Sequence, residues 1–183
     1  MLEAEVKLPL SAADAATLHR HLDALGAREA GTLHQVDTYL SHPGRDFRST
    51  DEALRLRSED GTLRVTYKGP KLDPPRKTRE EIEFALGTDH ATASTLLERL
   101  GFRAAAEVRK VRREWTLADG FAVTVCIDEV EGLGTFAEIE VEAASVDESR
   151  TRLAAVQASL GLAHLAPIAD SYLELLAALA RPQ

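Results

Sequence analysis

The sequence of 183 residues is poor in cysteine, in aromatic side chains and in long apolar runs. Its single cysteine, Cys126, excludes an intramolecular disulfide and argues against a zinc site built from cysteine thiolates. No apolar run approaches the roughly 20 residues that a membrane-spanning helix needs. The N-terminus also lacks a basic segment followed by an apolar stretch, so we expect no signal peptide. These absences predict a cytoplasmic protein with no membrane partner.

Positive charge is also in the minority, with 22 Lys and Arg against 30 Asp and Glu and a net charge of −8. A general nucleic-acid binder is usually basic, so we expect no nucleic-acid partner. The overall sign does not exclude a local cationic site, because a cleft can concentrate one sign of charge. With 44% hydrophobic and 28% charged residues, the composition is typical of a globular protein. We expect one domain over residues 1–183.

Alternation of apolar and polar residues predicts about eight strands, and helix-capping residues and glycine stops indicate four helices. The predicted strands are residues 2–9, 33–41, 53–58, 63–68, 78–86, 103–117, 121–130 and 135–143. The predicted helices are residues 11–25, 89–100, 147–160 and 169–179. Asp60-Gly61 and Asp119-Gly120 are hairpin signals between neighbouring strands, so antiparallel pairing is expected. The irregular order of strands and helices indicates the α+β class.

Nearly every predicted strand has one face of charges of both signs and one apolar face. On the first strand, Glu3, Glu5 and Lys7 share the charged face. The other strands contribute Arg55, Arg57, Arg64, Lys68, Arg79, Glu81, Glu83, Lys110, Arg112, Glu114, Asp128, Glu138, Glu140 and Glu142. The ordinary interpretation is a sheet with one solvated face. A sheet rolled into a barrel would instead enclose the charges and turn its apolar face outward, under the helices.

Enclosed charges are costly unless they are paired or matched by a ligand. An enclosure with both cations and carboxylates would be matched by a polyanion together with divalent metal ions. Arg offers a planar fork of donors to phosphate oxygens, and Lys a compact charge. Carboxylates two residues apart on a strand share a face and can converge on Mg²⁺ or Mn²⁺. The chain has no G-x-x-x-x-G-K-[ST] loop, so side chains would have to bind the phosphates.

The motif Glu3-x-Glu5-x-Lys7 resembles the signature of the CYTH superfamily, the triphosphate tunnel fold. Further segments resemble its class IV adenylate cyclase branch, namely residues 35–39, 42–47, 50–57, 66–70, 78–83, 108–115 and 128–140. The likeness runs from Glu3 to about Tyr172. It implies a closed eight-stranded antiparallel β-barrel, the triphosphate tunnel, with helices packed outside. It also implies a homodimer as a frequent form.

The resemblance further implies which side chains bind. Two ions, Mg²⁺ or Mn²⁺, would be held by Glu3, Glu5, Asp128, Glu138 and Glu140. The triphosphate substrate would be bound by Lys7, Arg55, Arg57, Lys68, Arg79, Lys110 and Arg112. Of these, the residues expected to act in catalysis are Lys7, Arg57, Lys110 and Arg112. No residue is assigned to an adenine ring.

The expected reaction converts ATP into 3′,5′-cyclic AMP and pyrophosphate, by attack of the ribose 3′-hydroxyl on the α-phosphorus. A metal-dependent triphosphatase is the first alternative, acting on inorganic triphosphate, thiamine triphosphate or a nucleoside triphosphate. A non-catalytic module that binds polyphosphate or a nucleotide is the second. The same cations and metals serve all three.

Four other features are interpreted more simply. Cys126 and Trp115 are expected to be packing residues. Tyr172 is expected to pack in a helix, with closure of the tunnel mouth as the alternative. The segment 69–77 is either a plain connection or a mobile basic lid.

Overall fold

The computed structural model describes residues 2–70, 80–118 and 122–180, and it confirms the predicted eight strands and four helices. The strands are β1 (Leu2–Leu10), β2 (Arg28–Ser41), β3 (Ala53–Glu59), β4 (Thr62–Lys68), β5 (Glu81–Leu86), β6 (Arg103–Ala118), β7 (Ala122–Val130) and β8 (Gly134–Ala143). The helices are α1 (Ala12–Ala24), α2 (His90–Arg99), α3 (Val146–Ser159) and α4 (Tyr172–Leu179). No described helix is long and apolar enough to cross a membrane.

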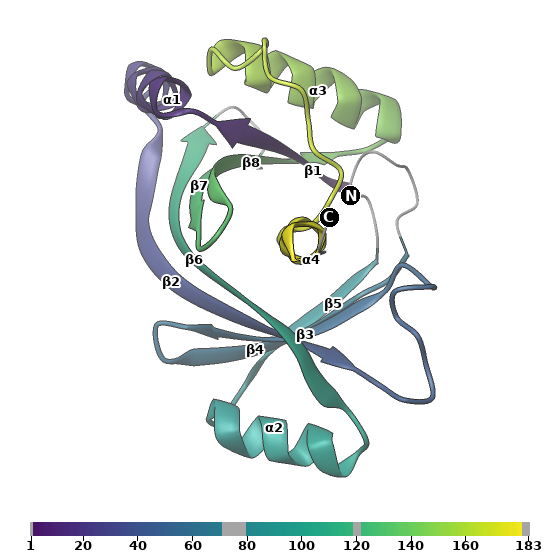
Figure 1. Ribbon diagram of the computed structural model, residues 1–183. Helices are drawn as coiled ribbons and strands as arrows, with labels where there is room; N and C mark the ends of the chain where they lie inside the picture. The colour runs from purple at the N-terminus through teal and green to yellow at the C-terminus, as the bar shows by residue number, and fades with distance from the viewer. Residues whose placement is uncertain (1, 71–79, 119–121, 181–183) are drawn as a thin grey trace.

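The eight strands form one strongly curved antiparallel sheet in the order β1-β8-β7-β6-β2-β3-β4-β5 (Figure 1). The α+β class is therefore confirmed. The predicted closure of the barrel is not: among the described residues, no hydrogen-bonded ladder joins β1 to β5. The C-terminal segment instead binds the edge of β1: the Ile168 N–H donates to the Lys7 carbonyl (N···O 2.8 Å). Helix α4 follows directly and lies on the concave side of the sheet.

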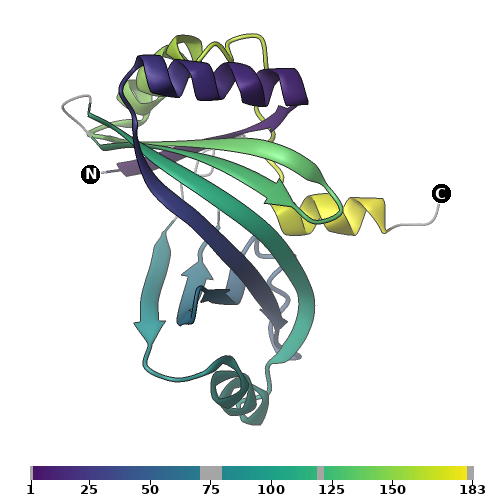
Figure 2. The same cartoon turned by 90° about the vertical axis from the view of Figure 1, so that its left-hand side faces the viewer.

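The apolar face of the sheet points outward and is covered by helices, as predicted, except on β5, where Ile82 and Phe84 are exposed. Leu18 and Leu22 of α1 pack with residues of α3 against the outer face of β1, β6, β7 and β8. Trp115 belongs to this core and meets His19 edge to face, with ring centroids 5.2 Å apart, so its interpretation as a packing residue is confirmed. Helix α2 covers a smaller cluster on β2, β3 and β4, at the other end of the sheet (Figure 2).

Local sequence signals set most of the element boundaries. Ser11 caps α1 and forms a capping box with Asp14. Asp60 and Gly61 adopt φ angles of 42° and 86°, which the tight β3–β4 hairpin requires. Helix α4 begins at Tyr172 rather than at residue 169, because the preceding residues bind β1 and Ser171 supplies the N-cap. These elements leave the concave face of the sheet to charged side chains, except where α4 packs against Val108, Val130 and Phe136.

Candidate active site

A cavity of about 350 Å³ lies on the concave side of the sheet, and its lining is almost entirely charged. Six of the lining residues are cationic, namely Lys7, Arg55, Arg57, Lys68, Lys110 and Arg112. Six are anionic, namely Glu5, Asp37, Glu81, Glu83, Glu138 and Glu140. The other three are Tyr39, Ser171 and Tyr172. Among the lining residues that the structure describes, the two signs are therefore equal in number.

The cavity brings together nine of the twelve predicted site residues, which are Glu5, Lys7, Arg55, Arg57, Lys68, Lys110, Arg112, Glu138 and Glu140. The predicted residue Arg79 lies outside the described residues, as does most of the predicted basic loop. Glu3 pairs with Glu142 in the β1–β8 ladder, but its side chain is likewise outside the description. Asp128 is buried behind the lining.

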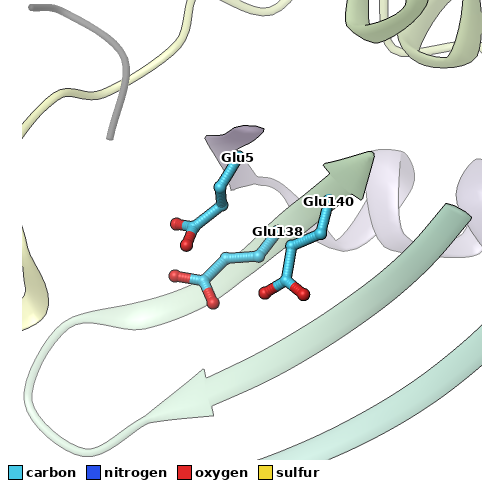
Figure 3. Close-up of side chains that lie close together, drawn as sticks. All are labelled: Glu5, Glu138 and Glu140. Atoms are coloured by element: carbon cyan, nitrogen blue, oxygen red, sulfur yellow. The ribbon is translucent and has the colours of Figure 1, made fainter. Parts of the chain in front are cut away.

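Three carboxylates from β1 and β8 converge at one place in the cavity (Figure 3). Glu5 lies directly opposite Glu140 in the β1–β8 ladder, and Glu138 precedes Glu140 by two residues, on the same face of β8. One oxygen from each of these side chains lies within 4.8 Å of the other two. Carboxylate oxygens are the ligands that Mg²⁺ and Mn²⁺ prefer, so this group fits a hard divalent cation.

Asp128 of β7 bonds to cations rather than joining this carboxylate group. Arg112 donates to it through Nε and Nη2, each at 2.7 Å, and the Lys110 ammonium donates at 2.7 Å. The phenol of Tyr172 is a third donor, at 2.9 Å. Burial raises the pKa of the Asp128 carboxyl, but the hydrogen bond from Arg112 and the charge of Lys110 outweigh burial and lower it. The carboxylate is thus held ionised by its neighbours.

Asp37 of β2 is a second buried carboxylate of this kind, to which the sequence prediction gave no role. Arg57 donates to it through Nε at 2.6 Å and Nη2 at 2.7 Å, and Arg55 through Nη1 at 3.2 Å. Burial raises the pKa of Asp37, but the hydrogen bond from Arg57 and both guanidinium charges lower it to about 2. Alternation along β2, which places Asp37 on the face of Gln35 and Tyr39, was the signal that could have found it.

The C-terminal segment supplies one wall of the cavity. The Lys7 ammonium lies 3.8 Å from the centroid of the Tyr172 ring and donates to the Asp170 carbonyl at 3.1 Å. Tyr172 also packs edge to face on Phe136, with centroids 5.2 Å apart, so it both packs and lines the cavity. Burial and the charge of Glu138 raise its pKa, which keeps the phenol protonated as a donor.

Lys110 and Cys126 complete the buried part of the site. Burial and the neighbouring Arg112 charge lower the pKa of the Lys110 ammonium. Burial raises the pKa of the Cys126 thiol, whose side chain is fully buried, so it behaves as the packing residue that the sequence predicted.

The opposite wall is made by β4 and β5. Lys68 donates to Glu81 at 2.6 Å, and Thr66 donates to Glu83 at 2.7 Å. Glu83 also lies 3.8 Å from the Arg55 guanidinium. This wall is more exposed than the β6–β7 wall, where Asp128 is fully buried.

Comparison with known proteins gives consistent relatives. A family model described as the CYTH domain matches residues 1–172. A Methanocaldococcus jannaschii protein named "Putative adenylate cyclase" is 38% identical over 178 residues, covering 96% of this chain and 98% of its own. The solved PH1819 protein of Pyrococcus horikoshii is 35% identical, with a TM-score of 0.81 over 97% of this chain and 99% of its own. A Vibrio parahaemolyticus "putative adenylate cyclase" shares the fold, at 20% identity and a TM-score of 0.79 over 97% and 98%.

Proposed function

Because the chain belongs to the CYTH domain family, we propose that its cavity binds the triphosphate end of a substrate with divalent cations and cleaves a phosphorus–oxygen bond there. The observation that carries this proposal is that the described lining of the cavity has six cationic and six anionic side chains. A triphosphate alone would add about four uncompensated negative charges to an enclosed space, which is costly. Two divalent cations would supply the four compensating charges.

The cations of the lining are arranged to receive phosphate oxygens. Arg57 and Arg112 each donate to an aspartate through Nε and Nη2, and each has further N–H donors. Lys7 and Lys110 add two compact charges from β1 and β6. Donors from several strands would therefore surround a bound triphosphate and stabilise the charge that develops on a leaving phosphate.

The carboxylates of Glu5, Glu138 and Glu140 would hold Mg²⁺ or Mn²⁺, and Glu3 is a further ligand predicted from the sequence. Asp128, the other predicted ligand, already accepts from Lys110 and Arg112. A bound ion of this kind supplies a Lewis acid and lowers the pKa of an attacking hydroxyl or water. Glu138 also accepts a hydrogen bond from Arg112 and lies 3.6 Å from the Lys7 ammonium. When Glu138 turns to a cation, both side chains regain donors for phosphate. Metal and triphosphate should therefore strengthen each other's binding.

The reaction we propose is the conversion of ATP into 3′,5′-cyclic AMP and pyrophosphate. It is supported by the name of the relative that is 38% identical over nearly the whole chain. Lys7, Arg57, Lys110 and Arg112 would stabilise charge on the α-phosphate and the departing pyrophosphate. The ribose 3′-hydroxyl would be the nucleophile, and the positioning of this group against the α-phosphorus would supply much of the rate.

Hydrolysis of a triphosphate is a second candidate, which one feature of the cavity favours. Among the described lining residues, only Tyr39 and Tyr172 are aromatic. Tyr172 already donates to Asp128 and lies against Lys7, so little apolar surface is left for a nucleobase. Such a lining suits inorganic triphosphate, or a substrate whose organic group lies outside the cavity.

One experiment separates these reactions. Purified protein is incubated with ATP, and in parallel with inorganic triphosphate, each with Mg²⁺ or Mn²⁺, and the products are separated by chromatography. Cyclic AMP with equimolar pyrophosphate would establish the cyclase, whereas orthophosphate without cyclic nucleotide would establish the triphosphatase. Calorimetric binding of triphosphate without any product would indicate a binding module, and no binding at all would refute the proposal.

A matched control is available on the surface of the same sheet. Glu129→Gln changes an exposed carboxylate of β7 that lies next to Asp128 and on the opposite face. It should turn over substrate like the wild type, whereas Arg57→Ala should not. The predicted homodimer is part of the proposal, and size-exclusion chromatography with light scattering tests it.

A further inference from the structure

Two buried aspartates grip two arginines of the cavity in the same way. Asp37 lies directly opposite Arg57 in the β2–β3 ladder, and Asp128 lies directly opposite Arg112 in the β6–β7 ladder. In both pairs the guanidinium donates through Nε and Nη2, at 2.6 and 2.7 Å to Asp37 and at 2.7 Å twice to Asp128. The two strand pairs are joined through the β2–β6 ladder, so both grips belong to one continuous wall.

A second cation completes each grip, and it comes from the same relative position. Arg55 precedes Arg57 by two residues and donates to Asp37, while Lys110 precedes Arg112 by two residues and donates to Asp128. We call these groups the Asp37 clamp (Asp37, Arg55, Arg57) and the Asp128 clamp (Asp128, Lys110, Arg112). Each clamp joins one carboxylate to two cations, so each keeps a net positive charge beside the cavity.

We propose that Asp37 and Asp128 are positioning residues that fix the two pairs of cations for phosphate binding, and that Asp128 does not ligate metal. Both carboxylates are nearly or fully buried, at 2% and 0% exposure. Both oxygens of Asp37 accept from the arginines, and Asp128 accepts from Lys110, Arg112 and Tyr172. The proposed function enters this inference only through the ligand, a triphosphate.

Positioning has a physical benefit that charge alone does not give. A long arginine side chain that is already held loses less rotamer freedom when a ligand binds, so more of the interaction appears as affinity. A grip through Nε and Nη2 also fixes the plane of the guanidinium, and with it the direction of the remaining N–H donors. The two clamps therefore act on phosphate through Arg57 and Arg112, not by touching it.

The sign of one mutational effect tests this idea. Asp37→Asn and Asp128→Asn each remove a negative charge near the cavity, which by simple electrostatics would tighten the binding of a polyanion. If the aspartates position the cations, binding should instead weaken by about 10- to 100-fold, as for loss of a hydrogen bond to a charged group. Calorimetric titration with inorganic triphosphate and Mg²⁺ measures this. Affinity that is unchanged or increased in both folded variants would overturn the inference.

Surface carboxylates provide matched controls. Glu107→Gln breaks an exposed pair with Arg109 on β6, and Glu129→Gln changes an exposed residue of β7 beside Asp128. Both should bind triphosphate like the wild type. If the wild type itself fails to bind triphosphate, the proposed function falls and this inference falls with it. Wild-type binding with undiminished binding in the aspartate variants overturns this inference alone.

Loss of a buried ion-pair partner can prevent folding, so a second pair of variants is needed. Arg57→Lys and Arg112→Lys keep the charge but remove the fork that the aspartates grip. With circular dichroism confirming the fold, positioning predicts that each still weakens triphosphate binding by about tenfold or more. Wild-type affinity in both lysine variants would show that charge suffices and that the grips have no positioning role.

A metal titration separates positioning by Asp128 from metal ligation. Mn²⁺ alone, without phosphate, is titrated into wild type, Asp128→Asn and Glu140→Gln, with free Mn²⁺ followed by electron paramagnetic resonance. We expect Glu140→Gln to weaken Mn²⁺ binding by about tenfold or more and Asp128→Asn to change it much less. An equal loss in the two variants would make Asp128 a metal ligand and overturn the assignment made here.

Discussion

Replacement of Asp37 by Asn should change how the stability of this protein depends on pH. In the folded chain, burial raises the pKa of Asp37, but Arg57 and Arg55 lower it from the ordinary 3.8 to about 2. Because the folded-state value lies below the unfolded-state value, ionised Asp37 stabilises the fold above about pH 4. That contribution is lost as the pH falls towards 2. The difference in pKa corresponds to about 2 kcal/mol of unfolding free energy at neutral pH.

Urea titrations of the wild type and of Asp37→Asn between pH 6 and pH 2.5 would measure this term. The wild type should be the more stable at pH 6, and the gap in unfolding free energy should narrow by roughly 1.5 kcal/mol by pH 2.5. The gap narrows because Asp37 is already largely protonated in the unfolded chain at pH 2.5, whereas it is still mostly ionised in the folded chain. Glu107→Gln, at an exposed surface pair, should run parallel to the wild type over the whole range. A gap of constant size for Asp37→Asn would refute the reasoning.

Four further substitutions test other parts of the structure. Replacing both Glu3 and Glu5 by Gln should abolish metal-dependent turnover and leave the circular-dichroism spectrum intact. Full turnover in this double variant would show that the two residues are not metal ligands. Arg57→Ala should weaken triphosphate binding by about 1–3 kcal/mol in calorimetry, and no loss would exclude Arg57 from the site. Tyr172→Phe removes a donor to Asp128 and should lower the unfolding free energy by about 1 kcal/mol; an unchanged urea midpoint would contradict this. Leu18→Ala, at a fully buried position of α1, should cost about 2–5 kcal/mol, and a smaller loss would mean that α1 contributes little to the core.

The placement of most site residues could be predicted because a strand repeats every two residues. Once Glu5 and Lys7 are assigned to one strand, they must share a face, and the same holds for Glu138 and Glu140. Turn chemistry then fixed the neighbouring strands, as Asp60-Gly61 shows between β3 and β4. The enclosed side could be inferred because nearly every strand has charges of both signs on one face.

The remaining features depend on contacts between segments that are distant in the sequence, and local sequence patterns do not predict such contacts. Alternation places Asp37 on the charged face of β2, but its hydrogen-bond partner Arg57 lies across the β2–β3 ladder. The register of that ladder cannot be predicted from either strand alone. The resemblance implied Asp128 as a metal ligand, and the contacts of its carboxylate with Lys110 and Arg112 on β6 could not be predicted from β7 alone. Closure between β1 and β5 failed as a prediction for a similar reason. The sequence of β1 does not indicate that its edge will accept a backbone hydrogen bond from Ile168.

The carboxylate group of Figure 3 joins β1 to β8, which are far apart in the sequence, and this determines when the group can form during synthesis. Glu5 leaves the ribosome before Glu138 and Glu140, which follow it by 133 and 135 residues. Strand β1 has its ladder with β8, so until then it has no neighbouring strand within the part of the chain that the structure describes. A chain released before Glu140 therefore cannot bring the three carboxylates together, even if its earlier strands have paired.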